Sequence, residues 1–242
     1  MTYSVKYRYI SPYILEISWP AIIDEQILLE IIPVKDAIHA KWKTELVNMT
    51  MGYHCLSLHF KKPINFSSLL TEIEEIRLQI PMHVPLKKNR WSIPVCYDSG
   101  KGTDLNVLAK ALQMDKEEVI HIHGSSTYLL YFYGFLPGFM YLGGLSEKLF
   151  LPRKAVPQRH VEKGSVAIGG KQTGIYPVNS PGGWWIIGRT PAQLFDFRSK
   201  NMVMAQPGDE VRFKVVDQDL FHYLQQEEAA GRNTIFNEII NG

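Results

Sequence analysis

Few residue patterns in this 242-residue chain are specific enough to identify a catalytic group. Gly170-Lys171 is similar to the end of a phosphate-binding loop, but that motif needs glycine where Ser165 stands and serine or threonine where Gln172 stands. No Gly-x-Ser-x-Gly segment is present, and no serine, histidine and aspartate follow a recognisable hydrolase order. The sequence therefore predicts neither a self-contained ATPase nor a covalent nucleophile.

Histidines and cysteines give no metal-binding pattern. His121 and His123 are expected on one face of a strand, yet no HExxH motif or cysteine cluster would complete a coordination sphere. Cys55 and Cys96 lie in apparent strands without CxxC spacing, which is typical of buried thiols. We expect no metal site and no disulfide.

Residues 128–191 concentrate glycine, proline and aromatic side chains, and they contain the best candidates for binding a small molecule. Gln172 can both donate and accept hydrogen bonds, as recognition of a lactam or amide requires. Tyr176 and Trp184 could form apolar walls around a small ring. The alternative for each residue is a structural role in a β-barrel with tight corners.

Two arginines flank these loops. Arg153 and Arg189 carry planar guanidinium groups, which suit a carboxylate or phosphate group of a substrate. They could equally hold the barrel together through ion pairs or bonds to backbone carbonyls, and the residue pattern leaves both roles open.

The first part of the chain predicts a small α+β domain over residues 1–84. Alternating residues predict strand pairs within 3–19 and 45–60. Asp24 should cap a helix that Pro33 kinks or splits, and Ser67 or Ser68 should cap a second helix ending near residue 80. The prolines and charges of residues 81–90 favour an extended linker, so we place the boundary there.

Residues 85–242 predict a second, mainly β domain with a C-terminal helical tail. We expect a strand at 91–97 and helices that begin at Asp104 and Asp115. Short runs between turn signals indicate a barrel from Tyr128 onward, and a helix should follow Val216. The last segment, 231–242, is expected to be a loose tail.

Charge and hydropathy exclude some partners. The net charge of +2 arises from 26 basic and 24 acidic residues spread along the chain, so no basic stripe favours nucleic acid or an anionic membrane surface. Because no long apolar segment or signal-peptide pattern is present, we expect a cytoplasmic protein.

Four segments in order carry a resemblance to one family: GFLPGFMYLGGL at 134–145, LPR at 151–153, GSVAIGGKQTGIYP at 164–177 and SPGGWWIIGRTP at 180–191. They are similar to the allophanate hydrolase subunit 1 family, which includes the B subunit of bacterial ATP-dependent 5-oxoprolinase and the Kip inhibitor of sporulation sensor kinases. The similarity extends over nearly the whole chain.

The resemblance implies a cyclophilin-like barrel in the second domain and one component of a 5-oxoprolinase, which converts 5-oxoproline to glutamate at the expense of ATP. Such a component is not active alone: it would act with a C subunit of the subunit 2 family and an A subunit of the LamB/YcsF family. ATP and Mg²⁺ would be used by the assembled complex, with none bound by this chain alone. The alternatives are a Kip-like inhibitor that binds a histidine kinase, and a component that processes urea or allophanate.

The resemblance also suggests roles for single residues. Catalytic candidates are His123, for orientation or proton transfer, with Gln172 and Arg153; Tyr176, Trp184 and Arg189 would bind substrate. Apolar residues of the glycine- and proline-rich loops would contact a partner: Phe135, Pro137, Phe139, Tyr141 and Pro181. The chain departs from the family pattern at Gln158, where arginine is usual, and at Glu162, where proline is usual. The first departure removes one anion contact.

Overall fold

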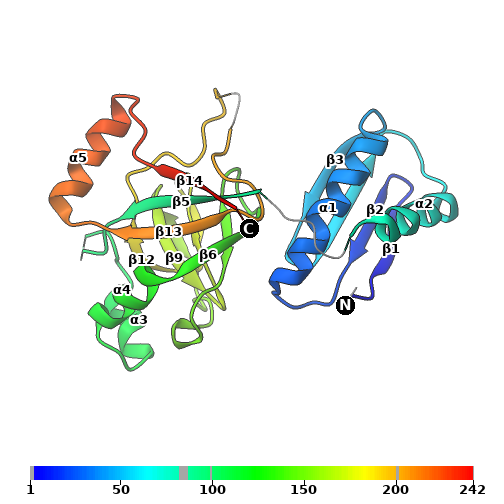
Figure 1. Ribbon diagram of the computed structural model, residues 1–242. Coiled ribbons are helices and arrows are strands. Elements are labelled where there is room, and N and C mark those ends of the chain that lie inside the picture. Colours follow the sequence, from blue (N-terminus) through cyan, green and yellow to red (C-terminus); the bar gives the residue numbers. More distant parts are fainter. Residues whose placement is uncertain (1–2, 82–86, 99, 200–201, 242) are drawn as a thin grey trace. The chain divides into compact units, whose positions relative to one another are not determined.

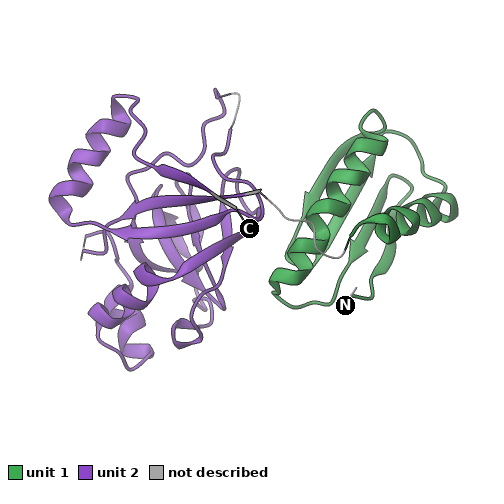
Figure 2. Cartoon of the chain, viewed as in Figure 1, with its two compact units in different colours: residues 1–86 green, residues 87–242 purple. Residues whose placement is uncertain are grey.

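The computed structural model describes residues 3–81, 87–98, 100–199 and 202–241. The chain divides into two compact units, residues 1–86 and 87–242 (Figure 2). In the described part of the chain, no helix is long and apolar enough to cross a membrane.

The first unit is a four-stranded antiparallel sheet with two helices, and it confirms the predicted strand pairs. The strands are β1 (Lys6–Ser11), β2 (Ile14–Ser18), β3 (Leu46–Met51) and β4 (Cys55–Phe60), in the order β1-β2-β4-β3. The sheet lies against the helices α1 (Glu25–Trp42) and α2 (Phe66–Gln79) (Figure 1). Alternate residues of β2 and β4, such as Leu15 and Leu58, share one core with these helices. Period-2 alternation places these side chains on the single face that the helices cover.

The helix starts in this unit follow capping chemistry. Asp24 caps α1 as predicted, because its side chain accepts a hydrogen bond from Gln26 N. Pro33 does not split α1, since the buried face of the helix continues on both sides of it. The cap of α2 is Asn65, whose side chain accepts from Ser68 N, so the predicted cap at Ser67 or Ser68 is wrong: both serines lie in the first turn.

The second unit contains a large sheet whose strand order is β12-β9-β10-β7-β6-β13-β5-β14. The strands are β5 (Lys87–Val95), β6 (Thr127–Tyr133), β7 (Met140–Gly143), β9 (Ser165–Gly169), β10 (Gln172–Ile175), β12 (Trp185–Arg189), β13 (Glu210–Val215) and β14 (Phe236–Asn241). A separate ribbon pairs β8 (Gln158–Val161) with β11 (Ser180–Gly182). The helical segments are α3 (Leu105–Ala111), α4 (Lys116–Ser125), η1 (Glu147–Leu149) and α5 (Gln218–Ala229).

This sheet curls back on itself. Cys96 N donates to Arg189 O at 2.9 Å, and Arg189 N donates to Cys96 O at 2.8 Å. The bridge joins the residue after β5 to the end of β12, although these strands lie near opposite edges of the sheet order. The apolar core, with residues such as Leu130, Val166 and Phe213, is enclosed by the curled strands and by α3 and α4.

Two expectations about chain segments are wrong. Lys87–Arg90, expected in the linker, begins β5, where Arg90 forms ion pairs with Glu210 of β13 and Glu238 of β14. The expected loose tail contains β14, which pairs antiparallel with β5. The charge of Arg90, which suggested solvated chain, is instead paired across strands. Residues 82–86 of the expected linker lie outside the described residues.

The histidine pair is not on a strand. The helix that begins after Asp115 continues to Ser125, so His121 and His123 both lie on α4. Residues two apart on a helix point in different directions, and accordingly His121 is exposed and His123 is buried.

The pairing of β14 makes a prediction for hydrogen exchange. Amides of residues 236–241 should show alternating protection, because an edge strand directs every second N–H toward its neighbour and the others toward solvent. Amide exchange followed by NMR tests this. Uniformly fast exchange along the segment would mean that it is the loose tail expected from its sequence.

Candidate functional site

An aromatic cavity of about 400 Å³ lies in the second unit. Five aromatic rings line it: Phe135, Phe139, Tyr141, Tyr176 and Trp184. The remaining lining residues come from the same loops, from the segment before β8 and from β11: Leu136, Arg153, Lys154, Pro157, Ser180, Pro181, Gly182 and Gly183. Seven residues predicted from the sequence as site or interface residues therefore meet at one cavity.

Phe139 is the centre of the ring cluster. Its ring makes edge-to-face contacts with Tyr176 (5.1 Å between centroids), Trp184 (5.4 Å) and Phe135 (5.6 Å). Edge-to-face pairs contribute about 0.5–1.5 kcal/mol each beyond the area they bury. Phe139 is only 1% exposed, so it supports the cavity wall and offers no surface to a partner, contrary to its predicted place in an interface.

Glycines provide the space for two of these rings. A Cβ at Gly169 would lie 2.5 Å from the ring of Trp184, and one at Gly182 would lie 2.3 Å from the hydroxyl of Tyr176. Both distances are shorter than van der Waals contact. The glycine-rich motifs of the sequence thus allow rings to lie directly on the backbone.

Phe135 is held in a strained turn at the cavity. Its φ of 62° is positive, and Leu136 N donates to Gly134 O at 2.6 Å, which defines a γ-turn centred on Phe135. A γ-turn with positive φ is rare, and such strain costs about 1–3 kcal/mol. The ring is 61% exposed while its edge contacts Phe139 and Tyr176. Phe135, the outer wall of the cavity, is therefore the most exposed of the five rings.

A cation stands at the same cavity. The Arg153 guanidinium lies over the ring of Trp184, 5.4 Å from its centroid. Among the described residues, no carboxylate lies within ion-pair distance of this exposed side chain. Arg153 is thus available to an anionic ligand, as its residue type suggested.

Asp104 and Lys154 form an ion pair that the sequence did not reveal. Lys154 Nζ donates to Asp104 Oδ2 at 2.5 Å, and both side chains are 12% exposed. The same oxygen accepts from Ile186 N at 2.7 Å. Asp104 occupies the predicted cap position of α3, but its side chain does not cap the helix, because these two bonds hold it. No sequence motif signals the pair.

His123 is fully buried in the core, away from the cavity lining. Its Nδ1 lies 2.7 Å from the Tyr97 hydroxyl and its Nε2 lies 2.9 Å from Thr173 Oγ1. Since the Thr173 hydroxyl donates to Ala167 O at 3.0 Å, it must accept from Nε2–H, and Nδ1 then accepts from Tyr97. Burial lowers the pKa of His123 from 6.5 to about 3, so the ring is neutral.

The remaining candidates do not line the cavity. Gln172 is buried at the start of β10, opposite Gly169 in the β9–β10 hairpin. The Nε of Arg189 donates to Lys163 O at 3.0 Å, and its guanidinium pairs with Glu162. Pro137 is exposed on the loop before β7.

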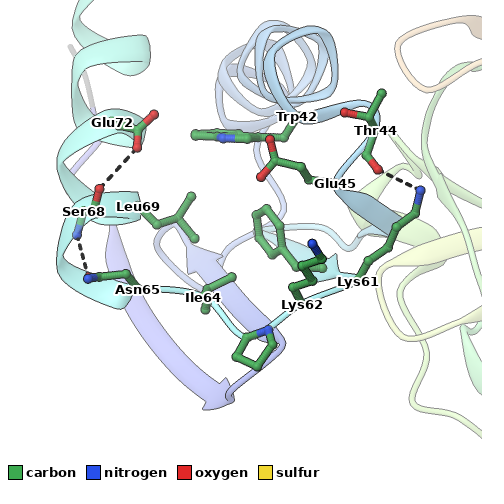
Figure 3. A pocket seen from close by; sticks show the side chains of 12 residues that line it. Trp42, Thr44, Glu45, Lys61, Lys62, Ile64, Asn65, Ser68, Leu69 and Glu72 are labelled. Carbon is green, nitrogen blue, oxygen red and sulfur yellow. Dashed lines mark hydrogen bonds between the residues drawn. The ribbon is translucent and has the colours of Figure 1, made fainter.

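A second cavity, of about 410 Å³, lies in the first unit (Figure 3). Trp42, Phe60 and Leu69 give it an apolar wall. Two of the charged groups that line it are engaged: Lys61 Nζ donates to Thr44 O at 2.7 Å, and Glu72 pairs with Lys41.

The fold and the cavity define a mixed α/β protein whose large curled sheet carries a cavity lined by aromatic rings. Residues 5–205 match the family described as carboxyltransferase domain, subdomain C and D, and the chain belongs to this family. The expected family resemblance is thereby confirmed.

Curated relatives share one name, the B subunit of 5-oxoprolinase. The relative from Bacillus subtilis (strain 168) is 39% identical over 162 residues, which cover 67% of this chain and 68% of the relative. The relative from Haemophilus influenzae is 39% identical over 171 residues, which cover 71% of this chain and 80% of the relative.

Solved structures are similar in fold. The urea carboxylase of Kluyveromyces lactis matches with a TM-score of 0.82 at 18% identity, covering 99% of this chain and 24% of that one. A solved chain named TTHA0988 matches with a TM-score of 0.74 at 29% identity, covering 84% of this chain and 40% of that one. Both of these chains are therefore much longer than the part that matches.

The neutral state of His123 predicts a pH dependence of stability. In the unfolded chain this histidine takes up a proton below its ordinary pKa of 6.5, whereas in the folded chain it stays neutral down to about pH 3. Unfolding therefore binds a proton in this window, and the free energy of unfolding should fall by up to about 1.4 kcal/mol per pH unit as pH drops from 6.5 to 3. Denaturant unfolding across this range measures the slope.

In His123→Gln, the free energy of unfolding should fall less steeply with pH between pH 6.5 and 3, by up to about 1.4 kcal/mol per pH unit. His160→Gln, which removes an exposed histidine of β8, is the control. Equal slopes in His123→Gln and the parent chain would show that His123 does not resist protonation.

The two phenylalanines of the cavity predict different costs of substitution. Phe139→Ala should lower the free energy of unfolding by about 3–5 kcal/mol, because it removes a buried ring. Phe135→Gly should change it by less than about 1 kcal/mol, because relief of the positive φ offsets the lost contacts. Chemical denaturation measures the free energy of unfolding of both variants. If both lose the same free energy of unfolding relative to the parent chain, the Phe135 turn is unstrained.

Proposed function

We propose that this chain is the B subunit of a multi-subunit, ATP-dependent 5-oxoprolinase that converts 5-oxoproline to glutamate. The observation that carries the proposal is the common name of the relatives, joined to a cavity of matching chemistry. The relatives favour neither the kinase inhibitor nor the urea-processing alternative. At 18% identity, the urea carboxylase supports the fold alone.

The cavity suits a small cyclic anion. Tyr176 and Trp184 supply flat apolar walls for the ring, and Arg153 supplies a cation for its carboxylate. The charge of Lys154 is balanced by Asp104, so Arg153 is the cation of the lining that lacks an acid partner in the described part of the chain. These residues would bind and orient the substrate and exclude water from it.

Gln172 and His123 are proposed to act indirectly, as positioning residues. His123 binds Thr173, the neighbour of Gln172 on β10, and β10 leads directly to Tyr176. The network therefore fixes the strand that carries one cavity wall.

The Gly170-Lys171 segment is not a phosphate-binding loop. Gly170-Lys171 forms the turn of the β9–β10 hairpin, and Gly170 bonds Leu151 through both backbone groups. Phosphate loops lie instead at helix N-termini. We therefore assign ATP and Mg²⁺ to the assembled complex and derive no step through them.

The partners in this proposal are a C subunit of the subunit 2 family and an A subunit of the LamB/YcsF family. Phe135, Pro137 and Pro181 are exposed at or next to the cavity and would contact a partner. The proposal also includes a cyclophilin-like barrel for residues 85–242 and an α+β domain for residues 1–84, which the curled sheet and the division near residue 86 support.

Reconstitution tests the function. The isolated chain should show no 5-oxoproline-dependent ATP hydrolysis, whereas the chain mixed with the A and C subunits should produce glutamate. Arg153→Ala should lower kcat/KM of the complex about tenfold or more, because a charge-assisted bond contributes about 1.5–3 kcal/mol. Arg159→Ala, an exposed arginine of β8 outside the cavity, should be neutral.

Gln172→Ala should also lower kcat/KM, with assembly intact by size-exclusion chromatography. Turnover by the isolated chain, or none by the fully assembled complex, would contradict the proposed function.

A further inference from the structure

The aromatic cavity contains a polar group that the fold leaves unused. Ser180 is 9% exposed, its Oγ is buried, and within the described part of the chain that atom has no hydrogen-bond partner. Ser180 lines the cavity beside the rings. Buried polar atoms of native proteins are nearly always satisfied, so an unsatisfied hydroxyl in a cavity indicates a partner that enters from outside.

The backbone holds Ser180 at this place. It lies on β11 opposite Val161 of β8, and the next residues are Pro181 and Gly182. Proline restricts the conformation of the residue before it, and Gly182 lies against the Tyr176 hydroxyl. The strand therefore presents the serine hydroxyl in a fixed position among apolar walls.

The other lining groups define what would bind there. Arg153 offers a positive charge without an acid partner among the described residues, and the rings of Tyr176 and Trp184 suit a small flat ring. A hydroxyl can donate to a carbonyl oxygen or accept from an N–H group. One cation, one hydroxyl and apolar walls match a cyclic amide that carries a single carboxylate.

We propose that this chain alone, without nucleotide or partner proteins, binds the cyclic amide substrate in the aromatic cavity, with Ser180 Oγ bonded to the ring amide and Arg153 bonded to the carboxylate. The assignment rests on the proposed function for the identity of the substrate. It makes Ser180, rather than the buried Gln172 outside the cavity, the residue that recognises the amide.

The same groups select substrate over product. Glutamate carries a second carboxylate and an ammonium group in place of the amide. Because Lys154 is already paired with Asp104, the cavity has no second free cation among its described lining residues, and its walls would desolvate the extra charges. Ring opening therefore weakens binding, and the product leaves.

The test measures binding to the isolated chain by calorimetry or ligand-observed NMR, with four probes. These are 5-oxoproline, 2-pyrrolidone, which lacks the carboxylate, cyclopentanecarboxylate, which lacks the amide, and glutamate. Ser180→Ala should weaken 5-oxoproline and 2-pyrrolidone about three- to tenfold, the range for one neutral hydrogen bond, and leave cyclopentanecarboxylate unchanged. Arg153→Ala should weaken 5-oxoproline and cyclopentanecarboxylate and leave 2-pyrrolidone unchanged.

A second readout separates recognition from structural damage. Removing an unsatisfied hydroxyl should raise the thermal midpoint of the ligand-free Ser180→Ala chain, although the same change weakens ligand binding. Ser125→Ala, an exposed serine of α4, should alter neither quantity. A lower midpoint with uniformly weaker binding of all probes would mean that Ser180 is only structural and would overturn the assignment.

The outcomes distinguish this inference from the proposed function. If the isolated chain binds none of the probes while the complete complex hydrolyses 5-oxoproline, the inference fails and the function stands. If the probes bind with the expected pattern but the complete complex forms no glutamate, the function fails and the cavity assignment stands. Unchanged 5-oxoproline affinity in Ser180→Ala would overturn the inference.

Discussion

The second unit depends on the buried carboxylate of Asp104. It receives the ammonium group of Lys154 and the backbone N–H of Ile186, while Asp104 N donates to Ile186 O. One side chain thus joins the start of α3, strand β12 and the loop that follows the LPR motif. Removing one member of a buried pair leaves an uncompensated charge, which costs about 3–5 kcal/mol. Since Arg153 directly precedes Lys154 and Trp184 lies two residues before Ile186, the position of this carboxylate also sets the position of the cavity.

Around this anchor, the cavity combines rigid and less constrained walls. Phe139, Tyr176 and Trp184 are buried rings packed edge to face, and glycines allow two of them to lie on the backbone. Phe135, by contrast, has a positive φ and a mostly exposed ring. A preorganised inner wall lowers the entropy cost of binding a small ring, and the outer wall can adjust when a ligand enters.

Much of the fold could be predicted from the sequence, because local signals sufficed for it. Alternation located the strands of the first unit, and the carboxylate of Asp24 located the start of α1. The failures arose from long-range pairing: Arg90 looked solvated, and its acid partners lie on β13 and β14.

In the candidate site, too, local sequence signals predicted some residues, while others depend on long-range contacts. Ring types indicated Tyr176 and Trp184, but Asp104 and Lys154 are brought together only by the tertiary fold. The amide of Gln172 suits recognition of a lactam, but burial on β10 keeps this side chain out of the cavity lining. Side-chain chemistry is thus readable from sequence, whereas the direction in which a buried side chain points depends on contacts between distant segments.

The position of β14 has a consequence for synthesis on the ribosome. Strand β5 is the first strand of the second unit to emerge, yet it lies between β13 and β14, and its Arg90 pairs with Glu238, 148 residues later in the chain. Both edges of β5 therefore stay unpaired until β13 and β14 have been made. The first unit closes its own sheet from residues near one another in sequence, so it can fold early in translation, whereas the second unit must wait for these two late strands. A nascent chain stalled before β14 would expose a long strand edge to aggregation.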